Sequence, residues 1–284
     1  MVGLSRNDGD RFTRCAQGHV HWGRFGAAGL MIYHDEHVLL QRRSWWTPGR
    51  NSWALFGGAR HRDEEPVATA LRETAEESTL PPDAARVHGI ITEDHGNWAY
   101  HTVFGTVPAL LDVRPGSRET RAAAWVPVSE VDQLRLFTPF ERTWPRLRDG
   151  LRRPVLVVDC ANVMGSRADK WWLDRAGAAA RLRDELAPLT ERGCTAIHPF
   201  DRAHPEIVLV VEGRARGIGS GATKIRVVDA ERIGDDTIVA LVSEPDPDAR
   251  YLVITADRAL RARCEAAGAQ VTGPRWLLRQ LSTE

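Results

Sequence analysis

Three short runs of consecutive apolar residues in the C-terminal half constrain the fold more than any other feature of the sequence. They lie at residues 155–158, 207–211 and 251–254. An uninterrupted apolar run of this length is typical of a strand buried on both faces. Weaker strand patterns lie at 225–228 and 270–271, and helical patterns lie at 173–189, 235–242 and 260–267. Because buried strands alternate with helices, we expect a three-layer α/β domain with a parallel sheet.

The N-terminal half has a different pattern. Residues 27–42 hold two apolar runs on either side of a polar turn, which predicts a hairpin. A helix is expected from Pro66 to Glu77, because proline and nearby acids favour a first helical turn. Further strands are expected at 87–91, 99–107 and 123–128. The charged segment 148–154 separates the two patterns, so we expect two domains, residues 1–150 and 151–284.

Composition excludes several classes of protein. The chain has 284 residues, of which 43% are hydrophobic and 27% charged, as in a soluble globular protein. The formal net charge is zero, so no global basic field indicates a nucleic-acid partner, although a local basic groove remains open. The longest apolar run is too short to span a membrane, and the N-terminus has no signal-peptide core. We expect a cytoplasmic protein with no membrane partner, and nothing indicates its oligomeric state.

The four cysteines are far apart in the sequence and form no C-x-x-C pair. A zinc ribbon or a disulfide framework is therefore not expected. Cys15 with His19 and His21 is the only group containing a cysteine that resembles a metal site. It has no fourth ligand nearby in the sequence, so we expect these residues to have a structural role.

Three glutamates on the predicted helix are the first candidate site. Glu73, Glu76 and Glu77 are spaced so that their carboxylates share one face of the helix. Like charges this close destabilise a bare helix, and clustered oxygen ligands suit Mg²⁺ or Mn²⁺. On spacing alone, a solvated acidic helix face is an equally good interpretation.

The segment around these glutamates resembles the signature of the Nudix hydrolase family, G-x5-E-x7-R-E-U-x-E-E-x-G-U, in which U is apolar. Every charged position of the signature is present at the right spacing, at Gly58, Glu64, Arg72, Glu73, Glu76 and Glu77. Thr74 stands at an apolar position of the signature and Thr79 at a glycine position. In addition, Phe56 stands where many relatives have proline. These departures lie outside the carboxylate set.

The resemblance covers about residues 20–150 and implies an α/β/α sandwich with a mixed sheet. It implies hydrolysis of a nucleoside diphosphate linked to another group. The three glutamates would bind the divalent ions with help from the carbonyl of Gly57, and would act as the catalytic residues. Such ions neutralise phosphate charge and activate water. Candidate substrate-binding residues are Trp46, Trp53, Arg72 and Trp98, and for the aromatic ones both base stacking and core packing are open.

A second set of acids follows the predicted strands of the C-terminal half. Asp159, Glu212 and Asp257 each come directly or almost directly after a strand, and Asp235 and Asp236 begin a helix. The carboxyl ends of parallel strands meet at one edge of a sheet, so we expect Asp159, Glu212, Asp236 and Asp257 to share a divalent-metal site. Helix capping is the alternative, and for Asp235 alone it is the better interpretation.

This half is similar to PIN-like nucleases of the NYN type. The resemblance rests on D-x-x-N after the first strand, D-D before a helix and T-x-D-R after a late strand. It implies a metal-dependent ribonuclease with Asp159 and Asp257 as catalytic residues and Asn162 near the substrate. Single-stranded RNA would then be a partner, and Trp171 and Trp172 could line its groove.

Together these features predict a Nudix hydrolase that cleaves the pyrophosphate bond of a nucleotide with Mg²⁺ or Mn²⁺, fused to a ribonuclease domain. Two alternatives remain. In one, a Nudix-like module altered at Phe56 and Thr79 senses a nucleotide and regulates the nuclease. In the other, the two domains together process RNA 5′ caps.

Overall fold

The computed structural model describes residues 8–244 and 246–282 and divides into two compact units. The first unit ends at Leu151 and also includes His198–Asp201. The second comprises Arg152–Ile197 and the chain from Arg202 onward. The division after Leu151 falls inside the charged segment 148–154.

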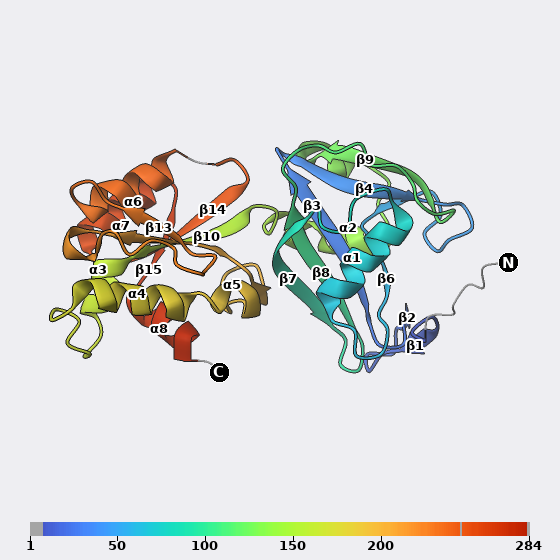
Figure 1. Cartoon of the computed structure of the whole chain (residues 1–284). Coiled ribbons are helices and arrows are strands. Elements are labelled where there is room, and N and C mark those ends of the chain that lie inside the picture. Colours follow the sequence, from blue (N-terminus) through green and yellow to red (C-terminus); the bar gives the residue numbers. More distant parts are fainter. Residues whose placement is uncertain (1–7, 245, 283–284) are drawn as a thin grey trace. The chain divides into compact units, whose positions relative to one another are not determined.

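The first unit is built on a mixed sheet with β3 (Ala27–His34) at its centre (Figure 1). Strand β3 pairs in parallel with β8 (Ala99–Thr106) and antiparallel with β4 (His37–Arg43) and β6 (Phe56–Ala59). Asp35 and Glu36, between β3 and β4, both have positive φ, as a tight hairpin turn requires. The sheet is completed by β7 (Arg86–Asp94), β5 (Trp53–Ala54) and β9 (Thr120–Pro127). The mixed sheet and the hairpin predicted at 27–42 are confirmed.

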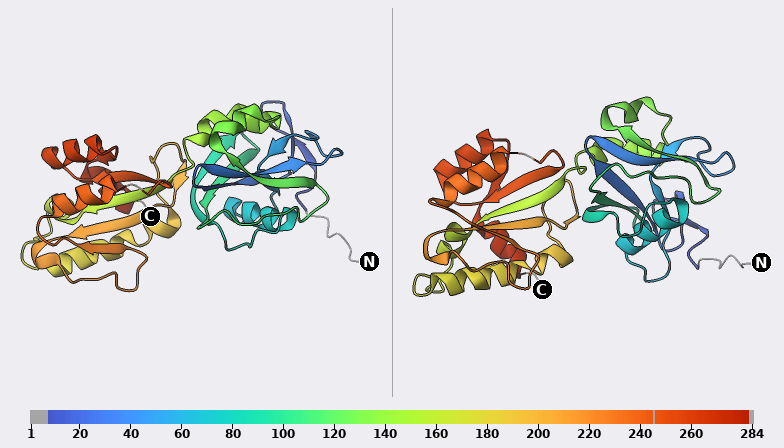
Figure 2. Two further views of the ribbon diagram at one scale, coloured as in Figure 1. Left: turned by 90° about the horizontal axis from the view of Figure 1, so that it is seen from above. Right: turned by 45° about the horizontal axis from the view of Figure 1, so that its top comes forward.

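Two helices cover the two faces of this sheet (Figure 2). Helix α1 (Pro66–Glu77) has the bounds predicted from the sequence, and its Ala70 packs into a core with Leu30, Phe56 and Val103. Helix α2 (Thr138–Arg148) buries Phe140, Trp144 and Leu147 on the other face. A 3-10 turn, η1 (Val128–Gln133), precedes α2, and a separate small hairpin is formed by β1 (Phe12–Arg14) and β2 (Val20–Trp22).

A short segment distant in the sequence completes the first unit. The ring of Phe200 packs edge-on against Phe104, with 5.4 Å between the ring centroids. It also fills the space beside Gly89, where a Cβ would lie 2.3 Å from the ring. The backbone N–H of Asp201 donates to the carbonyl of Ile90 at 3.0 Å. The hydrophobic core of this unit is therefore closed by residues beyond the predicted domain boundary.

The second unit contains the predicted parallel sheet. Its strand order is β13-β12-β10-β14-β15, and every neighbouring pair is parallel. The strands are β10 (Arg153–Asp159), β12 (Glu206–Val211), β13 (Arg226–Asp229), β14 (Ala249–Ile254) and β15 (Gln270–Thr272). A two-residue strand, β11 (Arg202–Ala203), and a 3-10 turn, η2 (Gly213–Ala215), lie in the connections.

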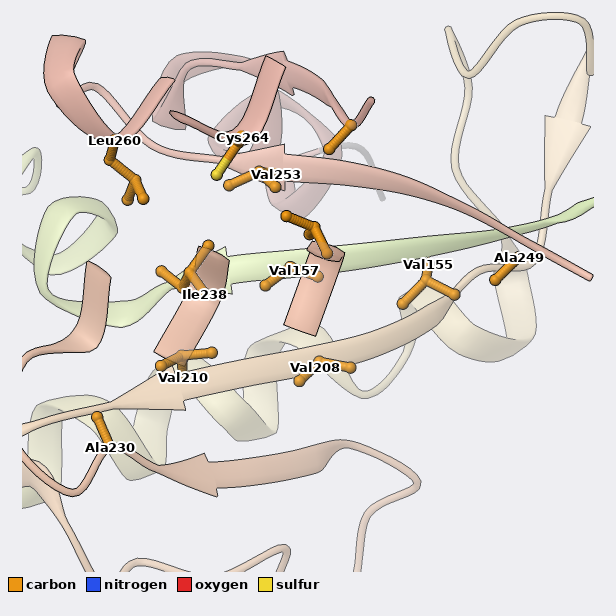
Figure 3. Close-up of a cluster of buried hydrophobic side chains, with 12 residues drawn as sticks. Val155, Val157, Val208, Val210, Ala230, Ile238, Ala249, Val253, Leu260 and Cys264 are labelled. Carbon is orange, nitrogen blue, oxygen red and sulfur yellow. The ribbon is translucent and has the colours of Figure 1, made fainter. Parts of the chain in front are cut away.

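Helices lie on both faces of the parallel sheet (Figure 2). On one face, Val157, Val210 and Val253 pack beneath Ile238 of α6 (Gly234–Ser243) and Leu260 of α7 (Arg258–Ala266) (Figure 3). The other face carries α3 (Cys160–Gly165), α4 (Arg175–Leu186), α5 (Leu189–Arg192) and α8 (Pro274–Ser282). The three-layer arrangement expected from the sequence is present.

The single helix predicted at 173–189 is wrong. Helix α4 ends at Leu186, and α5 begins again at Leu189 after Pro188. Proline lacks the backbone N–H that would continue the helix and disfavours a helical conformation in the residue before it. No helix within the described ranges is both long and apolar enough to cross a bilayer.

Candidate functional site

The three glutamates lie in the last two turns of α1 and differ in exposure. Glu77 is 8% exposed, and burial raises its pKa to about 7. Its Oε2 accepts hydrogen bonds from Nε2 of Gln41 at 2.8 Å and from the backbone N–H of Gly57 at 3.2 Å. The side chain of Glu73 is 14% exposed, and burial raises its pKa too, whereas that of Glu76 is 61% exposed. Two buried carboxylates and one exposed carboxylate therefore lie on one helix face.

Two glycines of β6 allow α1 to approach the sheet at this point. A Cβ on Gly58 would lie 2.5 Å from the carboxylate carbon of Glu73. A Cβ on Gly57 would lie 2.3 Å from the carbonyl oxygen of Ala28. A side chain at Gly57 would clash with the backbone of β3, and a side chain at Gly58 would displace the carboxylate of Glu73.

Arg72 of α1 forms an ion pair with Glu64, which lies just before the helix. Both oxygens of Glu64 accept from the guanidinium of Arg72, at 2.9 Å each. Hydrogen bonding to Arg72 lowers the pKa of Glu64 to about 2. Arg72 also bonds Glu73 at 2.8 Å and the carbonyl of Ala59 at 3.0 Å. All three guanidinium nitrogens thus bond within the protein, which holds Arg72 against Glu64 and Glu73.

The departures from the signature are accommodated locally. The hydroxyl of Thr74 donates to the carbonyl of Ala70 at 2.7 Å, and Phe56 is fully buried in the core. Thr79 does not have positive φ, so no glycine is needed there. Instead, Thr79 makes two hydrogen bonds of 2.9 Å with the backbone of Arg114, and the N–H of Gly116 caps the carbonyl of Glu77 at 2.8 Å. A neighbouring loop therefore ends the helix in place of a left-handed residue.

Two residues near the glutamates were not identified from the sequence. Gln41 of β4 is 1% exposed and bonds Glu77 directly. Asp10 lies in the N-terminal segment, where burial raises its pKa and the charges of His61, Arg72 and Glu76 act on it. Neither lies in the glutamate motif, and no periodicity marks them.

The candidate aromatic residues lie in different surroundings. Trp46 is 53% exposed beside Trp45, which is 65% exposed, and their rings meet edge to face at 5.5 Å. Trp53 is half-buried in β5. Trp98 is only 7% exposed, and its indole N–H donates to the carbonyl of Gly23 at 2.8 Å. Trp98 is therefore a packing residue, whereas the Trp45–Trp46 pair has free ring faces.

In the second unit, Asp159 is at the carboxyl end of β10 and is 6% exposed. Its carboxylate accepts from the backbone and side chain of Asn162, at 3.1 and 2.9 Å, and from the hydroxyl of Thr255 at 2.9 Å. Asn162 in turn accepts from the N–H of Ala256 at 3.2 Å. Burial raises the pKa of Asp159, with a further contribution from the charge of Glu212. The D-x-x-N and T-x-D-R segments are therefore linked at one sheet edge.

The choice of Asp236 as the inward acid is wrong. Asp236 forms a 2.7 Å ion pair with Arg263, and its side chain is 64% exposed. Asp235 instead has a raised pKa, caused by burial and by the charges of Asp159, Asp257 and Glu212. Consecutive side chains on an α-helix point about 100° apart, so Asp235 and Asp236 cannot both face the edge of the sheet.

Helix capping, the alternative role for the acids that follow the strands, is observed for some of them. Asp257 caps α7 by accepting from the N–H of Leu260 at 2.8 Å, and Asp159 caps α3. Glu212 accepts from the N–H of Gly234 at 2.7 Å. Asp235, which was expected to be a cap, makes no capping bond, since α6 has Ile233 at its N-cap. Some of these acids therefore cap helices and also lie close to the other acids at this edge of the sheet.

Comparison with known proteins matches residues 23–147 to the NUDIX domain. A "Nucleoside triphosphate pyrophosphatase/Nudix hydrolase fusion protein" of Bifidobacterium longum is 36% identical over 147 residues, which are 49% of this chain and 30% of that protein. A "Putative 8-oxo-dGTP diphosphatase 3" of Mycobacterium tuberculosis is 37% identical over 154 residues, 50% of this chain and 70% of its own length. The crystal structure of RenU, a Nudix hydrolase from M. smegmatis, shares 32% identity with a TM-score of 0.47, covering 50% of this chain and 94% of that one.

Proposed function

This chain belongs to the Nudix family, and on that premise we propose that its first unit hydrolyses the pyrophosphate bond of a nucleoside diphosphate derivative with Mg²⁺ or Mn²⁺. The observation that carries the proposal is the position of Glu73, Glu76 and Glu77 on one face of α1, against the Gly57–Gly58 backbone. Glu73 and Glu77 are largely buried there, and burial raises the pKa of both.

The donor set fits a hard divalent ion. Carboxylate oxygens are the ligands that Mg²⁺ and Mn²⁺ prefer, and a cation offsets the repulsion among the clustered glutamates. Glu73, Glu76 and Glu77 would hold the ions, with the carbonyl of Gly57 beside them. A bound ion supplies phosphate charge neutralisation and water activation. Arg72 keeps Glu73 in place through their 2.8 Å bond, and Gln41 and Gly57 fix the orientation of Glu77.

We propose nucleoside triphosphates as the substrate class, with oxidised guanine nucleotides among the first to test. The two relatives described above, named "Putative 8-oxo-dGTP diphosphatase 3" and "Nucleoside triphosphate pyrophosphatase/Nudix hydrolase fusion protein", support this choice. The exposed faces of Trp45 and Trp46 offer a surface on which a purine base could stack.

The test is a screen of nucleoside triphosphates, dinucleotides, nucleotide sugars and capped RNA for phosphate or pyrophosphate release with Mg²⁺ and Mn²⁺. Glu76→Gln and Glu77→Gln should each lower turnover at least about a hundredfold, because stabilisation of charge by the metal contributes several kcal/mol. Glu65→Gln is the matched control, since Glu65 is exposed and makes no capping bond at the start of the same helix. Full activity in both site variants would contradict the proposal. Tight nucleotide binding without turnover would favour the nucleotide sensor.

For the second unit we propose a PIN-like, NYN-type ribonuclease whose divalent ion is held by Asp159, Glu212, Asp235 and Asp257. The supporting observations are the hydrogen bonds that Asp159 accepts from Thr255 and Glu212 accepts from the start of α6, at the carboxyl edge of the sheet. Burial and the charges of the other three acids also raise the pKa of Asp235. Clustered acids of this kind are stabilised by a bound cation. Single-stranded RNA is the proposed substrate.

The nuclease proposal is tested with Mn²⁺ and labelled single-stranded RNA. Asp159→Asn and Asp235→Asn should abolish cleavage, whereas Asp236→Asn should leave it nearly unchanged, because Asp236 is turned to Arg263. Nucleotide hydrolysis should be unaffected in all three variants. Cleavage that depends on Asp236 and not on Asp235 would refute the assignment of the inward acid.

A further inference from the structure

One cysteine and three histidines meet at the edge of the first unit, away from the glutamates. Cys15, His19, His21 and His95 each offer one ligand atom, and these four atoms all lie within 4.8 Å of one another. Sγ of Cys15 is 4.0 Å from Nδ1 of His95. The rings of His21 and His95 are 4.7 Å apart between centroids. The fourth ligand is not near the others in the sequence, because His95 comes from a distant hairpin.

Two tight turns bring these residues together. Cys15 directly follows β1. The turn to β2 is closed by bonds from the N–H of Cys15 to the carbonyl of His19 and from the N–H of Gly18 to the carbonyl of Cys15, both 2.9 Å. His19 and His21 follow on the return of the hairpin, two residues apart. His95 lies in the β7–β8 turn, where its N–H donates to the carbonyl of Trp98 at 2.8 Å. Each ligand is therefore held by backbone that is already hydrogen-bonded.

The ring of His21 is held in place by stacking, while one of its nitrogens forms no hydrogen bond with the described residues. Its ring stacks on the buried indole of Trp98, with 3.9 Å between centroids and an interplanar angle of 11°. Nε2 of His21 is buried and has no hydrogen-bond partner among the described residues. A buried polar atom without a partner costs about 1–3 kcal/mol, so such atoms are rare unless something else satisfies them.

We propose that Cys15, His19, His21 and His95 form a closed, four-coordinate site for a structural Zn²⁺ ion. A thiolate with three imidazoles is a ligand set for a borderline-soft transition ion and not for the Mg²⁺ or Mn²⁺ of the glutamate site. Tetrahedral Zn²⁺, with Zn–S of about 2.3 Å and Zn–N of about 2.0–2.1 Å, places its ligand atoms about 3.3–3.7 Å apart. The observed 4.8 Å limit needs only a small contraction of side chains to reach that geometry.

The ion would fasten the β1–β2 hairpin to the β7–β8 turn. That hairpin is small and has few buried side chains of its own, so a crosslink has a large effect on its order. The segment preceding β1 carries Asp8, which bonds the N–H of Arg62 at 3.3 Å, and Asp10, which lies near Glu76. The zinc site would thereby also order the chain beside the glutamates. It does not depend on the hydrolase activity.

The first experiment measures zinc in the full-length protein by plasma mass spectrometry after purification without chelator. We expect about one Zn²⁺ per chain, as for a closed site. His21→Ala and His95→Ala should lose most of it. His37→Ala, which removes a histidine from the start of β4, and Glu77→Gln, which alters the glutamate site, should both retain it. Zinc content that is negligible in the wild type, or equal in the wild type and both ligand variants, would overturn the proposal.

A second measurement on the wild type keeps the test decisive if a ligand variant fails to fold. Zinc is removed with a chelator, and Co²⁺ is added in its place. We expect the visible bands of tetrahedral Co²⁺ together with a near-ultraviolet thiolate-to-cobalt band. Cys15→Ser should remove the thiolate band, whereas Cys194→Ser should retain it. The absence of a thiolate band in the wild type would show that Cys15 is not a ligand. Chelation should also lower Tm, and added Zn²⁺ should restore it.

Discussion

Nε2 of Gln41 donates a 2.8 Å hydrogen bond to Oε2 of Glu77. The same amide group donates to the carbonyl of Leu55 at 3.0 Å and accepts from the hydroxyl of Thr120 at 2.8 Å. The orientation of the most buried glutamate on α1 is thus set by a fully buried side chain on β4, before any ion binds.

Replacing Gln41 by leucine should therefore change the titration of Glu77. Loss of a donor disfavours the ionised carboxylate, so the pKa of Glu77 should rise above about 7. The acid limb of the pH–rate profile for nucleotide hydrolysis should move to higher pH. Leaving the Thr120 hydroxyl and the Leu55 carbonyl unpaired should cost about 1–3 kcal/mol of stability. Gln133→Leu, at an exposed position, is the control. An unchanged pH profile in Gln41→Leu would contradict this role.

Gly58→Ala should weaken metal binding at the glutamates. The added Cβ would lie 2.5 Å from the carboxylate of Glu73, so that carboxylate must move. We expect the Mg²⁺ concentration for half-maximal activity to rise about tenfold, since a displaced ligand costs on the order of 1.4 kcal/mol. Gly273→Ala, where a new Cβ meets nothing within 4 Å, should have no effect. Equal metal dependence in the two variants would argue against Glu73 as a ligand.

The Glu64–Arg72 pair should make stability depend on pH in acid. The folded-state pKa of Glu64, about 2, is below the ordinary value of 4.5. A depressed carboxylate pKa gives stability that is present above about pH 4.5 and is lost as the pH falls toward 2. Glu64→Gln should thus be less stable than the wild type at pH 7, and the difference should shrink below pH 4.5. Urea unfolding across this range measures it, with Glu130→Gln as an exposed control. A difference that does not vary with pH would contradict the ion pair.

Trp46→Ala and Trp98→Ala should have different effects. Trp46 is half exposed with a free ring face, so its loss should raise KM for a purine nucleotide about tenfold, as stacking contributes about 1–3 kcal/mol. Trp98 is buried, so its loss should lower stability by about 3–5 kcal/mol. Steady-state kinetics and thermal unfolding of both variants separate the two. An unchanged KM in Trp46→Ala would remove this residue from the substrate site.

Phe200→Ala should destabilise the first unit, although Phe200 lies well beyond residue 151 in the sequence. Its ring is 6% exposed and packs against Phe104 and His88. Truncating a buried phenylalanine costs about 3–5 kcal/mol. Phe12→Ala, at a position 60% exposed, is the control. A chain ending at Leu151 should likewise be less stable than the full chain, and equal unfolding midpoints would contradict the role of this segment.

Some features of this protein follow from neighbouring residues in the sequence, whereas others depend on packing between distant segments. Helix α1 follows from a proline at its start and from side-chain spacing, which are properties of a dozen neighbouring residues. The break at Pro188 was also readable, because proline acts on its own backbone and on that of its neighbour. By contrast, Asp235 and Asp236 are adjacent and chemically identical, and only packing of α6 on the sheet decides which one faces Asp159.

The sequence by itself determined helix α1, the main strands, the parallel arrangement of the second sheet and the grouping of Glu73, Glu76 and Glu77. Those features depend on periodicity within a segment, which can be read from consecutive residues. Only the tertiary structure decided that Gln41 meets Glu77, that Phe200 closes the first core and that His95 joins Cys15, His19 and His21. Each of these contacts joins residues from separate elements. Their proximity is set by how strands pair and helices pack, so a pattern within one segment of the sequence does not predict it.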